Sequence, residues 1–425
     1  MSLRRSLILG CVLYTLVLIG LASLNRAILA AALPLVFYAG SALLFLPGHL
    51  RLTVSRTLST TYTTPGKPVR VVVTVANNGQ HMEVIRVADG VPPGLETDGD
   101  TSLVAELPAG QTLELTYDVQ GRRGSYRYGE VEVSAYDPSG LFRRRKAYDV
   151  PTRLSILPRV PEVRSVLIRP ARTRGVAGLI PSRRGGSGTD FYGVRAYEPG
   201  DPLRWINWRM SARHPRELFT NEFEQERIAD VGLILDARER SEVLLGGESL
   251  FEHSVEATAA LADTFLEDGN RVALLIYGRG LERTFPGYGK HQRQRILRSL
   301  SQAQVGDSLV FDSFDYLPTR FFPAKSQIVL VSPLCEDDPP MLTRLRARGY
   351  EILVISPDAV DFEAKRLALP SRVAHLAPRI ARAERYLWIR QLQRVGVTVI
   401  DWQVDARLDM TIDAAIRKPA RQLAR

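Results

Sequence analysis

The residues best placed for chemistry are an aspartate and its neighbours at the end of a short apolar run. Val231–Leu235 is predicted to be a buried strand, and it leads directly into Asp236-Ala237-Arg238-Glu239-Arg240. Ligands of open parallel sheets bind beyond the carboxyl ends of the strands, so Asp236 is the first position to consider for a metal ion or a reactive carboxylate. Arg238 and Arg240 argue against a metal site here, because a guanidinium repels a metal cation and has no lone pair to coordinate it.

A second concentration of charged and aromatic side chains lies between Gly188 and Glu226. We weigh two interpretations of it. In the first, the segment is a docking surface for a partner protein. In the second, Arg195, Asp201 and Arg204 form partly buried ion pairs that pin the segment to the next domain.

The local pattern of this segment predicts a short helix followed by a strand. Asp201 before Pro202 is typical of an N-cap with proline at the first helical position, which starts a helix running toward Arg213. Pro215 disfavours helical geometry at the residue before it and ends the helix. The alternation from Glu217 to Glu226 then predicts an extended strand.

Other catalytic signatures are absent from the sequence. Gly287-Tyr288-Gly289-Lys290 lacks the spacing and the hydroxyl of a phosphate-binding loop, and Gly185–Gly188 is better explained as a flexible linker. The histidines are scattered without metal-ligand spacing, at positions 49, 81, 214, 253, 291 and 375. We therefore name no catalytic residue and no bound cofactor.

The elements that carry these residues form two kinds of domain. Residues 51–150 contain short alternating runs separated by turns, which predict an all-β immunoglobulin-like sandwich. Residues 151–227 are a connector that includes the segment at 188–226. Residues 228–415 alternate apolar strands with helices, which predicts an α/β domain with a mainly parallel sheet, and residues 416–425 are a basic tail.

The first 50 residues predict a transmembrane helical hairpin. Two uncharged apolar runs, with spans at about 7–24 and 27–47, are separated by Asn25 and Arg26. Arginines outside both spans place the two ends, and the soluble domains, in the cytoplasm of a cell-membrane protein. A net charge of +10 then fits an anionic membrane surface, with membrane lipid as a partner, better than nucleic acid. Two distant cysteines, Cys11 and Cys335, fit a reducing compartment.

The segment at 188–226 resembles the signature of the "domain of unknown function 58" family, on the residues Arg195, Tyr197, Gly200, Asp201, Arg204, Trp208, Ala212 and Arg213. The resemblance implies a membrane-anchored protein whose α/β domain is similar to the von Willebrand factor A type. Domains of that type often bind Mg²⁺ through an Asp-x-Ser-x-Ser loop. Here both serine positions carry arginine, and Ser332-Pro333 replaces a further aspartate, so a degenerate site is expected at Asp236, Arg238 and Arg240. Asp236 is expected to pair with one of these arginines or to cap a turn.

The resemblance also implies a partner. Members of the family are commonly encoded near MoxR-type AAA ATPases, which indicates a non-enzymatic scaffold or adaptor in a chaperone-like assembly system. Two alternatives remain open. One is a hydrolase of envelope material with an unrecognised site near Asp236 and Glu239, and the other is a Mg²⁺-dependent adhesion module.

Overall fold

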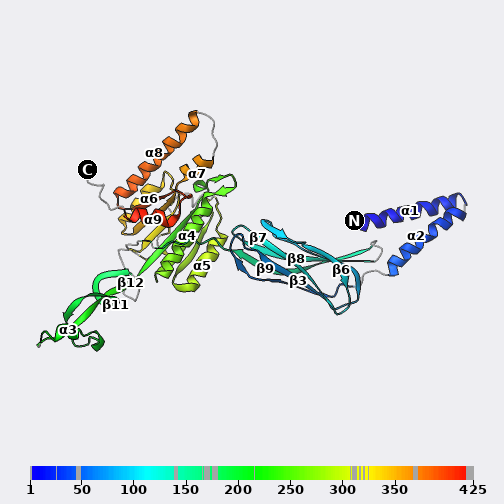
Figure 1. Cartoon of the computed structure of the whole chain (residues 1–425). Helices are drawn as coiled ribbons and strands as arrows, with labels where there is room; N and C mark the ends of the chain where they lie inside the picture. The colour runs from blue at the N-terminus through cyan, green and yellow to red at the C-terminus, as the bar shows by residue number, and fades with distance from the viewer. Residues whose placement is uncertain are drawn as a thin grey trace. The chain divides into compact units, whose positions relative to one another are not determined.

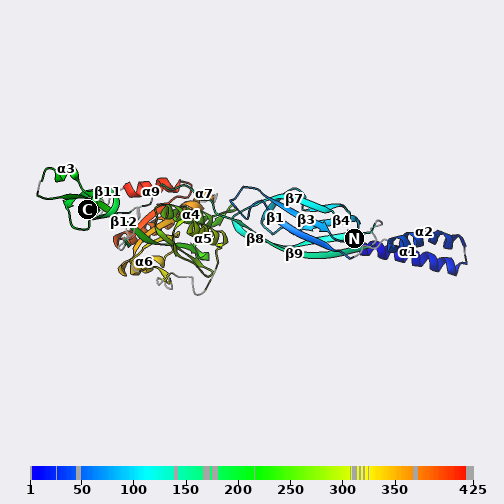
Figure 2. The ribbon, with the colours of Figure 1, turned by 90° about the horizontal axis from the view of Figure 1, so that it is seen from below.

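The computed structural model describes most of the chain, in two compact units, Met1–Leu157 and Pro158–Arg425. The described residues are 2–24, 26–44, 49–137, 142–164, 166, 173–174, 180–214, 216–306, 308, 314, 317–318, 321–323, 325–366 and 372–417. Most of the predicted basic tail, residues 418–425, lies outside them. Figures 1 and 2 show the ribbon in two views.

The first unit begins with two helices, α1 (Ser2–Ala22) and α2 (Arg26–Leu44). Leu24 takes a positive φ of 51° between them, where the chain reverses (Figure 1). The helices contact each other closely, since a Cβ added at Gly20 would lie 3.0 Å from the side chain of Leu29.

The prediction of a transmembrane hairpin is wrong. Among the helices in the part of the chain that the structure describes, none has both the length and the apolar character needed to cross a membrane. The predicted localisation, in the cell membrane with the soluble domains in the cytoplasm, depended on these two spans. It is therefore also wrong.

The structure shows why the apolar runs were misleading. α1 includes Arg4 and Arg5, and its apolar part from Leu7 to Ala22 covers about 24 Å at 1.5 Å per residue, less than the roughly 30 Å of a bilayer core. α2 ends at Leu44. The apolar run that follows it reaches Leu50, which is 6% exposed and belongs to the core of the next domain.

That domain consists of two sheets over one shared core, and neighbouring strands are antiparallel except for the short strand Tyr62–Thr63, which pairs parallel with Arg143–Ile156. The first sheet has the order β1-β3-β7-β5, with bounds Leu52–Leu58, Val69–Asn77, Thr112–Gly121 and Leu95–Asp98. The second has the order β2-β9-β8-β4-β6, with bounds Tyr62–Thr63, Arg143–Ile156, Gly124–Tyr136, Met82–Asp89 and Ser102–Leu107. Valines at alternate positions of β3 are fully buried, as the period of two requires.

A charged pair is enclosed in this core. The guanidinium of Arg56 donates to Asp89, and neither side chain is exposed. Arg56 also donates to the carbonyls of Gly129 and Val150, and the hydroxyl of Tyr117 donates to Asp89 at 2.7 Å. Because these groups satisfy one another, the buried charges are tolerated.

The second unit is built on a sheet of order β16-β15-β12-β17-β18-β19. All neighbours are parallel except β16, which is antiparallel to β15. The bounds are β12 (Phe219–Ala237), β15 (Arg271–Gly278), β16 (Leu281–Gly287), β17 (Gln327–Val331), β18 (Glu351–Pro357) and β19 (Thr398–Trp402). The chain order reverses at β12, with β15 on one side and β17 on the other, and such a reversal places a crevice at the carboxyl ends of these strands.

Helices connect the strands, as the sequence pattern predicts. They are α4 (Leu250–Glu267), α5 (Gly289–Gln302), α6 (Asp338–Ala347), α7 (Ala359–Arg366), α8 (Arg372–Arg394) and α9 (Leu408–Arg417). A small hairpin, β13 (Leu244–Leu245) with β14 (Glu248–Ser249), precedes α4. Ser249 caps α4 by accepting a hydrogen bond from the backbone of Glu252.

A hairpin arm extends from this sheet. β11 (Ile180–Ala196) pairs antiparallel with the first part of β12, whereas only Asp230–Ala237 of β12 pairs with β15. The short strand β10 (Thr173–Arg174) pairs with β12 near its base. Figure 1 shows the arm projecting beyond the α/β body, with the loop between β11 and β12 at its end. Gly185–Gly188, predicted as a linker, lies inside β11, where the register shifts.

Candidate functional site

The crevice of the sheet is formed by the ends of β12 and β17. Asp236 is the second-to-last residue of β12, Ser332 follows β17, and Asp338 opens α6. Arg238, one residue beyond β12, extends its side chain among them and is 1% exposed. These four side chains come together where a ligand of such a sheet would bind.

The guanidinium of Arg238 bridges two carboxylates. Its Nε and Nη2 donate to the two oxygens of Asp236, each at 2.8 Å, and its Nη1 and Nη2 donate to the two oxygens of Asp338, each at 2.9 Å. The guanidinium carbon also lies 3.7 Å from the ring centroid of Phe314. Burial alone would lower the pKa of Arg238, but the two carboxylates outweigh it and raise the pKa.

The carboxylate of Asp236 is fully used inside this cluster. Besides Arg238 it accepts hydrogen bonds from the backbone nitrogen of Arg238 at 3.1 Å and from the hydroxyl of Ser332 at 2.7 Å. The expected pairing of Asp236 with Arg238 is thus present in the structure. A divalent cation does not fit here, because a fixed positive charge already occupies the space between the two carboxylates.

The rim of the cluster is also paired. Arg240 donates to Asp337 at 3.0 Å, and the backbone of Cys335 donates to Asp338 at 2.7 Å. Burial raises the pKa of the Cys335 thiol to about 12, so the sulfur stays protonated near neutral pH. Glu239 is exposed at the start of a short 3₁₀ helix, whereas Asp236 is buried. The two acids proposed for a hydrolase therefore have different surroundings.

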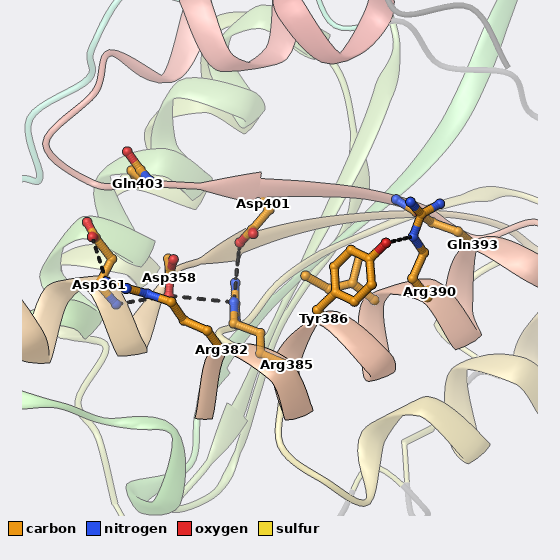
Figure 3. Close-up of a pocket in the computed structure, with 10 residues that line it drawn as sticks. Asp358, Asp361, Arg382, Arg385, Tyr386, Arg390, Gln393, Asp401 and Gln403 are labelled. Carbon is orange, nitrogen blue, oxygen red and sulfur yellow. Dashed lines mark hydrogen bonds and ion pairs between the residues drawn. The ribbon is translucent and has the colours of Figure 1, made fainter. Parts of the chain in front are cut away.

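A second buried arginine, Arg385 of α8, holds the neighbouring strand ends (Figure 3). It donates to the carbonyls of Pro333 at 2.6 Å, Ser356 at 3.1 Å and Pro357 at 3.3 Å, and to Asp401 at 2.6 Å. A cavity of about 750 Å³ opens beside it, between α7, α8 and the end of β19. Arginines thus occupy much of the edge of the sheet where a ligand would be expected.

The predicted signature residues lie at the far end of the arm. Arg195, near the end of β11, donates from both Nη atoms to Asp201, at 2.9 and 2.7 Å. Asp201 also accepts from the backbone of Glu198 at 3.0 Å, and Gly200 supplies the positive φ of 118° that the turn requires. These hydrogen bonds lower the pKa of Asp201, with Arg195 as the largest cause. The ion pair between Arg195 and Asp201 therefore stabilises the turn.

The helix predicted from Pro202 to Arg213 is wrong. The chain forms a 3₁₀ turn at Leu203–Trp205 and one turn of helix, α3 (Trp208–Ser211), capped by Asn207 and not by Asp201. The reason is an extended residue between them. Ile206 bridges to Thr220, and the backbone of Asn207 donates to Phe219 at 2.8 Å, so β12 competes with the helix for these groups.

The broken helix changes which side chains reach the surface. Ile206 is buried, but Leu203 is 70% exposed and Trp208 is 67% exposed, and Met210 and Leu218 are exposed as well. Among the other signature residues, Arg204 lies over the ring of Trp205, at 5.8 Å from its centroid. The interpretation that grouped Arg204 with Arg195 and Asp201 in ion pairs is therefore wrong for Arg204. Ala212 ends α3 and is exposed like Arg213, and Tyr197 donates its backbone NH to Leu218.

One family model matches part of the chain. The family model described as "Protein of unknown function DUF58" matches residues 193–371, from the end of β11 through the crevice to the end of α7. Over this stretch the chain matches the family. It is 26% identical to the uncharacterized protein YeaD of Bacillus subtilis over 78% of this chain and 82% of that protein.

Two other likenesses are more limited. The uncharacterized protein Rv1480 of Mycobacterium tuberculosis is 30% identical over 30% of this chain and 40% of its own length. The CARDB domain of a Pyrococcus furiosus protein matches 26% of this chain and 97% of its own length at 16% identity, with a TM-score of 0.18. A likeness of that size carries no functional argument.

Sequence reasoning missed two residues of the crevice. Asp338 is the second partner of Arg238, yet it lies 100 positions away, and its only sequence signal is its place before Pro339-Pro340 at a helix start. Arg385 lies in α8 among many other arginines, and nothing in the local sequence distinguishes it as the buried one.

Proposed function

We propose that this protein is a non-enzymatic adaptor that binds a partner protein through the loop at the end of its hairpin arm. The observation that carries this proposal is the exposure of four large apolar side chains in one loop, residues 197–218, which connects β11 to β12. They are Leu203, Trp208, Met210 and Leu218. Exposed large apolar side chains gathered in one place are typical of interaction sites, and tryptophan is enriched among the residues that dominate binding energy.

The charges of the loop indicate the chemistry of the partner. Arg204, Arg209, Arg213 and Arg216 are all exposed in the same loop, next to or between the apolar residues in sequence. Such a rim favours a partner with an apolar pocket bordered by acidic groups, and it makes association faster at low ionic strength. The ion pair between Arg195 and Asp201 supports the proposal indirectly, because it gives the loop a defined shape before binding.

The partner we propose is a MoxR-type AAA ATPase, on the strength of the family resemblance. We further propose that the α/β unit has the von Willebrand factor A arrangement, supported by its strand order and by the position of Asp236. The paired state of Asp236 weighs against both the hydrolase and the Mg²⁺-dependent adhesion module.

The test is direct binding between the purified full chain and a purified MoxR-type ATPase from the same source. We expect Leu203→Ser with Trp208→Ser to weaken binding at least tenfold, which corresponds to about 1.4 kcal/mol. The matched control is Phe285→Ser with Tyr288→Ser, which removes two equally exposed apolar side chains elsewhere in the same unit. Equal loss in both pairs would refute the loop as the binding site, and no binding by the unaltered chain would refute the ATPase as partner.

A further inference from the structure

The cavity between α7, α8 and the end of β19 is large enough for an organic ligand. Its volume of about 750 Å³ lies within the range of small-molecule sites. Asp358, which follows β18, lines it together with Asp401 at the end of β19 and Gln403 beyond that strand. The carboxyl ends of two parallel strands therefore open into the cavity, which is the edge where ligands of such sheets bind.

The aspartates of the cavity wall already have cations of this chain beside them. Arg385 donates to Asp401 at 2.6 Å and lies 3.6 Å from Asp358. Asp361 contacts Arg382 at 3.7 Å and, more closely, the lysine one turn further along α7 at 2.6 Å. None of the three carboxylates therefore offers an unbalanced negative charge, and the wall has little attraction for a cationic ligand.

Arg390 is the exception among the charged side chains of the wall. It is partly buried, and no carboxylate is paired with it in the part of the chain that the structure describes. Its Nε donates to the hydroxyl of Tyr386 at 2.7 Å, and its guanidinium carbon lies 5.0 Å from the centroid of that ring. Figure 3 shows it beside Gln393, at the end of the cavity away from Asp358 and Asp361.

The unpaired guanidinium selects the charge of the ligand. Its Nη1 and Nη2 donate to none of the described residues, and such a fork matches the two oxygens of a carboxylate or a phosphate. Because Tyr386 fixes the orientation of Arg390, less conformational entropy is lost when an anion binds. The three aspartates of the same wall repel a dianion more strongly than a monoanion, so a carboxylate fits better than a phosphate monoester.

The rest of the wall selects what is attached to the carboxylate. Asp401 accepts from Arg385 only through Oδ1, so among the described residues Oδ2 is left to accept from an N–H group of a ligand. Arg385 and Arg390 stand five positions apart on α8, about 7.5 Å along its axis, which equals about two residues of extended peptide. The exposed ring of Tyr386, with Ile389 next to it in the wall, provides an apolar surface between these two points.

We propose that this cavity binds the carboxylate end of a short peptide or acyl amino acid. The carboxylate lies in the fork of Arg390, an amide N–H donates toward Asp401, and an apolar side chain of the ligand packs on Tyr386. A free acyl amino acid and the C-terminus of a protein share this chemistry. The site is separate from the loop of the arm, so the two proposals stand or fall independently.

The probe is N-acetyl-glycyl-phenylalanine with a free carboxylate, and its matched control is the same compound with an amidated end. Binding to the full-length protein is measured by isothermal titration calorimetry. We expect the acid to bind at least tenfold more tightly than the amide, because only the acid neutralises Arg390. Inorganic phosphate and phenyl phosphate should bind more weakly than the acid.

Substitutions assign the binding to the cavity. Arg390→Gln should weaken binding of the acid at least tenfold. The matched control is Arg394→Gln, which removes an exposed arginine one turn further along α8 and should leave binding unchanged. Tyr386→Phe keeps the guanidinium but removes the hydroxyl that orients it, so its effect should be smaller than that of Arg390→Gln. Thermal unfolding of each variant checks that it is folded.

Four results would overturn the proposal. They are no binding of the acid at about 10 mM, equal binding of the acid and the amide, equal effects of Arg390→Gln and Arg394→Gln, or tighter binding of phosphate than of the acid. A longer peptide with the same two final residues distinguishes the sources: tighter binding supports a protein C-terminus, and exclusion supports a free acyl amino acid. Leu203→Ser with Trp208→Ser should bind the acid normally, which separates failure here from failure of the arm as a docking site.

Discussion

Arg238 and Asp338 are joined by two parallel hydrogen bonds of 2.9 Å, although they stand 100 positions apart in the chain. The pair ties the end of β12 to the start of α6, and Asp236 completes it from the other side at 2.8 Å. A permanent cation of the protein thus balances two buried carboxylates at the switch point of the sheet. The role of Arg238 at this edge of the sheet is therefore structural, since it holds β12 and α6 together.

Replacement of this cation should open the site to metal. In Arg238→Ser the carboxylates of Asp236 and Asp338 lose their counter-charge, and we expect a loss of about 3–5 kcal/mol in the stability of the second unit. Mg²⁺ or Mn²⁺ should recover part of it, because oxygen ligands then converge on an empty space. Thermal unfolding with and without the metal measures both effects.

The control for this substitution is Arg240→Ser. Arg240 is hydrogen-bonded to Asp337, which is mostly exposed, and approaches Asp338 only at 3.7 Å. Arg238 stays between the two buried carboxylates in this variant, so the substitution should cost little and create no response to metal. An equal response of the unaltered protein to Mg²⁺ would contradict our account of the crevice.

The sequence predicts the parallel sheet well because its strands carry their own signal. Val231–Leu235, Val272–Tyr277 and Ile352–Ile355 are short apolar runs between helical patterns, and each lies within a strand of the sheet. Burial on both faces demands such runs, so local composition is enough. The position of Asp236 at the edge of the sheet follows from the same reasoning.

The errors arose where distant residues decide the structure. The length of an apolar run could not show that Leu50 packs in a β core while α2 ends at Leu44. The Asp201-Pro202 pair is a good local start for a helix, but Arg195 takes the carboxylate and β12 takes the backbone of Asn207. Asp338 and Arg385 reach the crevice from other elements, which no spacing reveals.

The ion pair between Arg195 and Asp201 in the loop of the arm should persist at acidic pH. The hydrogen bonds from Arg195 and Glu198 lower the pKa of Asp201, so the folded loop binds that proton less readily than the unfolded chain does. The pair is therefore complete above the ordinary aspartate pKa and is lost as the pH falls through the lowered value. Hydrogen exchange at Glu198, followed across this range, measures it.

Glu222→Gln provides the control for the loop. Arg195→Ala should weaken the protection of Glu198, whereas Glu222→Gln should leave it unchanged, because the backbone of Glu198 donates to Asp201. Equal loss of protection in the two variants would show that Arg195 acts through Glu222, at 3.8 Å.

The thiol of Cys335 should be nearly inert to alkylation. Burial raises its pKa from 9.0 to about 12, so little thiolate is present at pH 8, whereas the other thiol, Cys11, is exposed. Mass spectrometry after iodoacetamide treatment should show Cys11 labelled at least tenfold faster. The unfolded chain ionises Cys335 first as the pH rises, so the stability of the second unit should fall between about 9 and 12.

Denaturation before labelling should remove the difference between the two thiols. A Cys335 that reacts as fast as Cys11 in the folded protein would show that the rim of the crevice opens on the time scale of the reaction, contrary to the paired arrangement of Arg240 and Asp338 above it.

Removal of the guanidinium of Arg385 should loosen the strand ends that it holds. Arg385→Met keeps the bulk of the side chain but leaves the carbonyls of Pro333 and Ser356 without this donor, and we expect a loss of about 2–4 kcal/mol. Arg382→Met, one turn away and half exposed, should cost less than about 0.5 kcal/mol. Hydrogen exchange in β18 and β19 is the measurement, because it reports on this edge without assuming that the whole chain unfolds in one step.

Arg385→Lys distinguishes charge from geometry: one ammonium can neutralise Asp401, but it cannot reach three carbonyls and a carboxylate together. Full protection in that variant would mean that charge alone holds the edge, whereas faster exchange confined to β18 would assign the role to the planar array of donors.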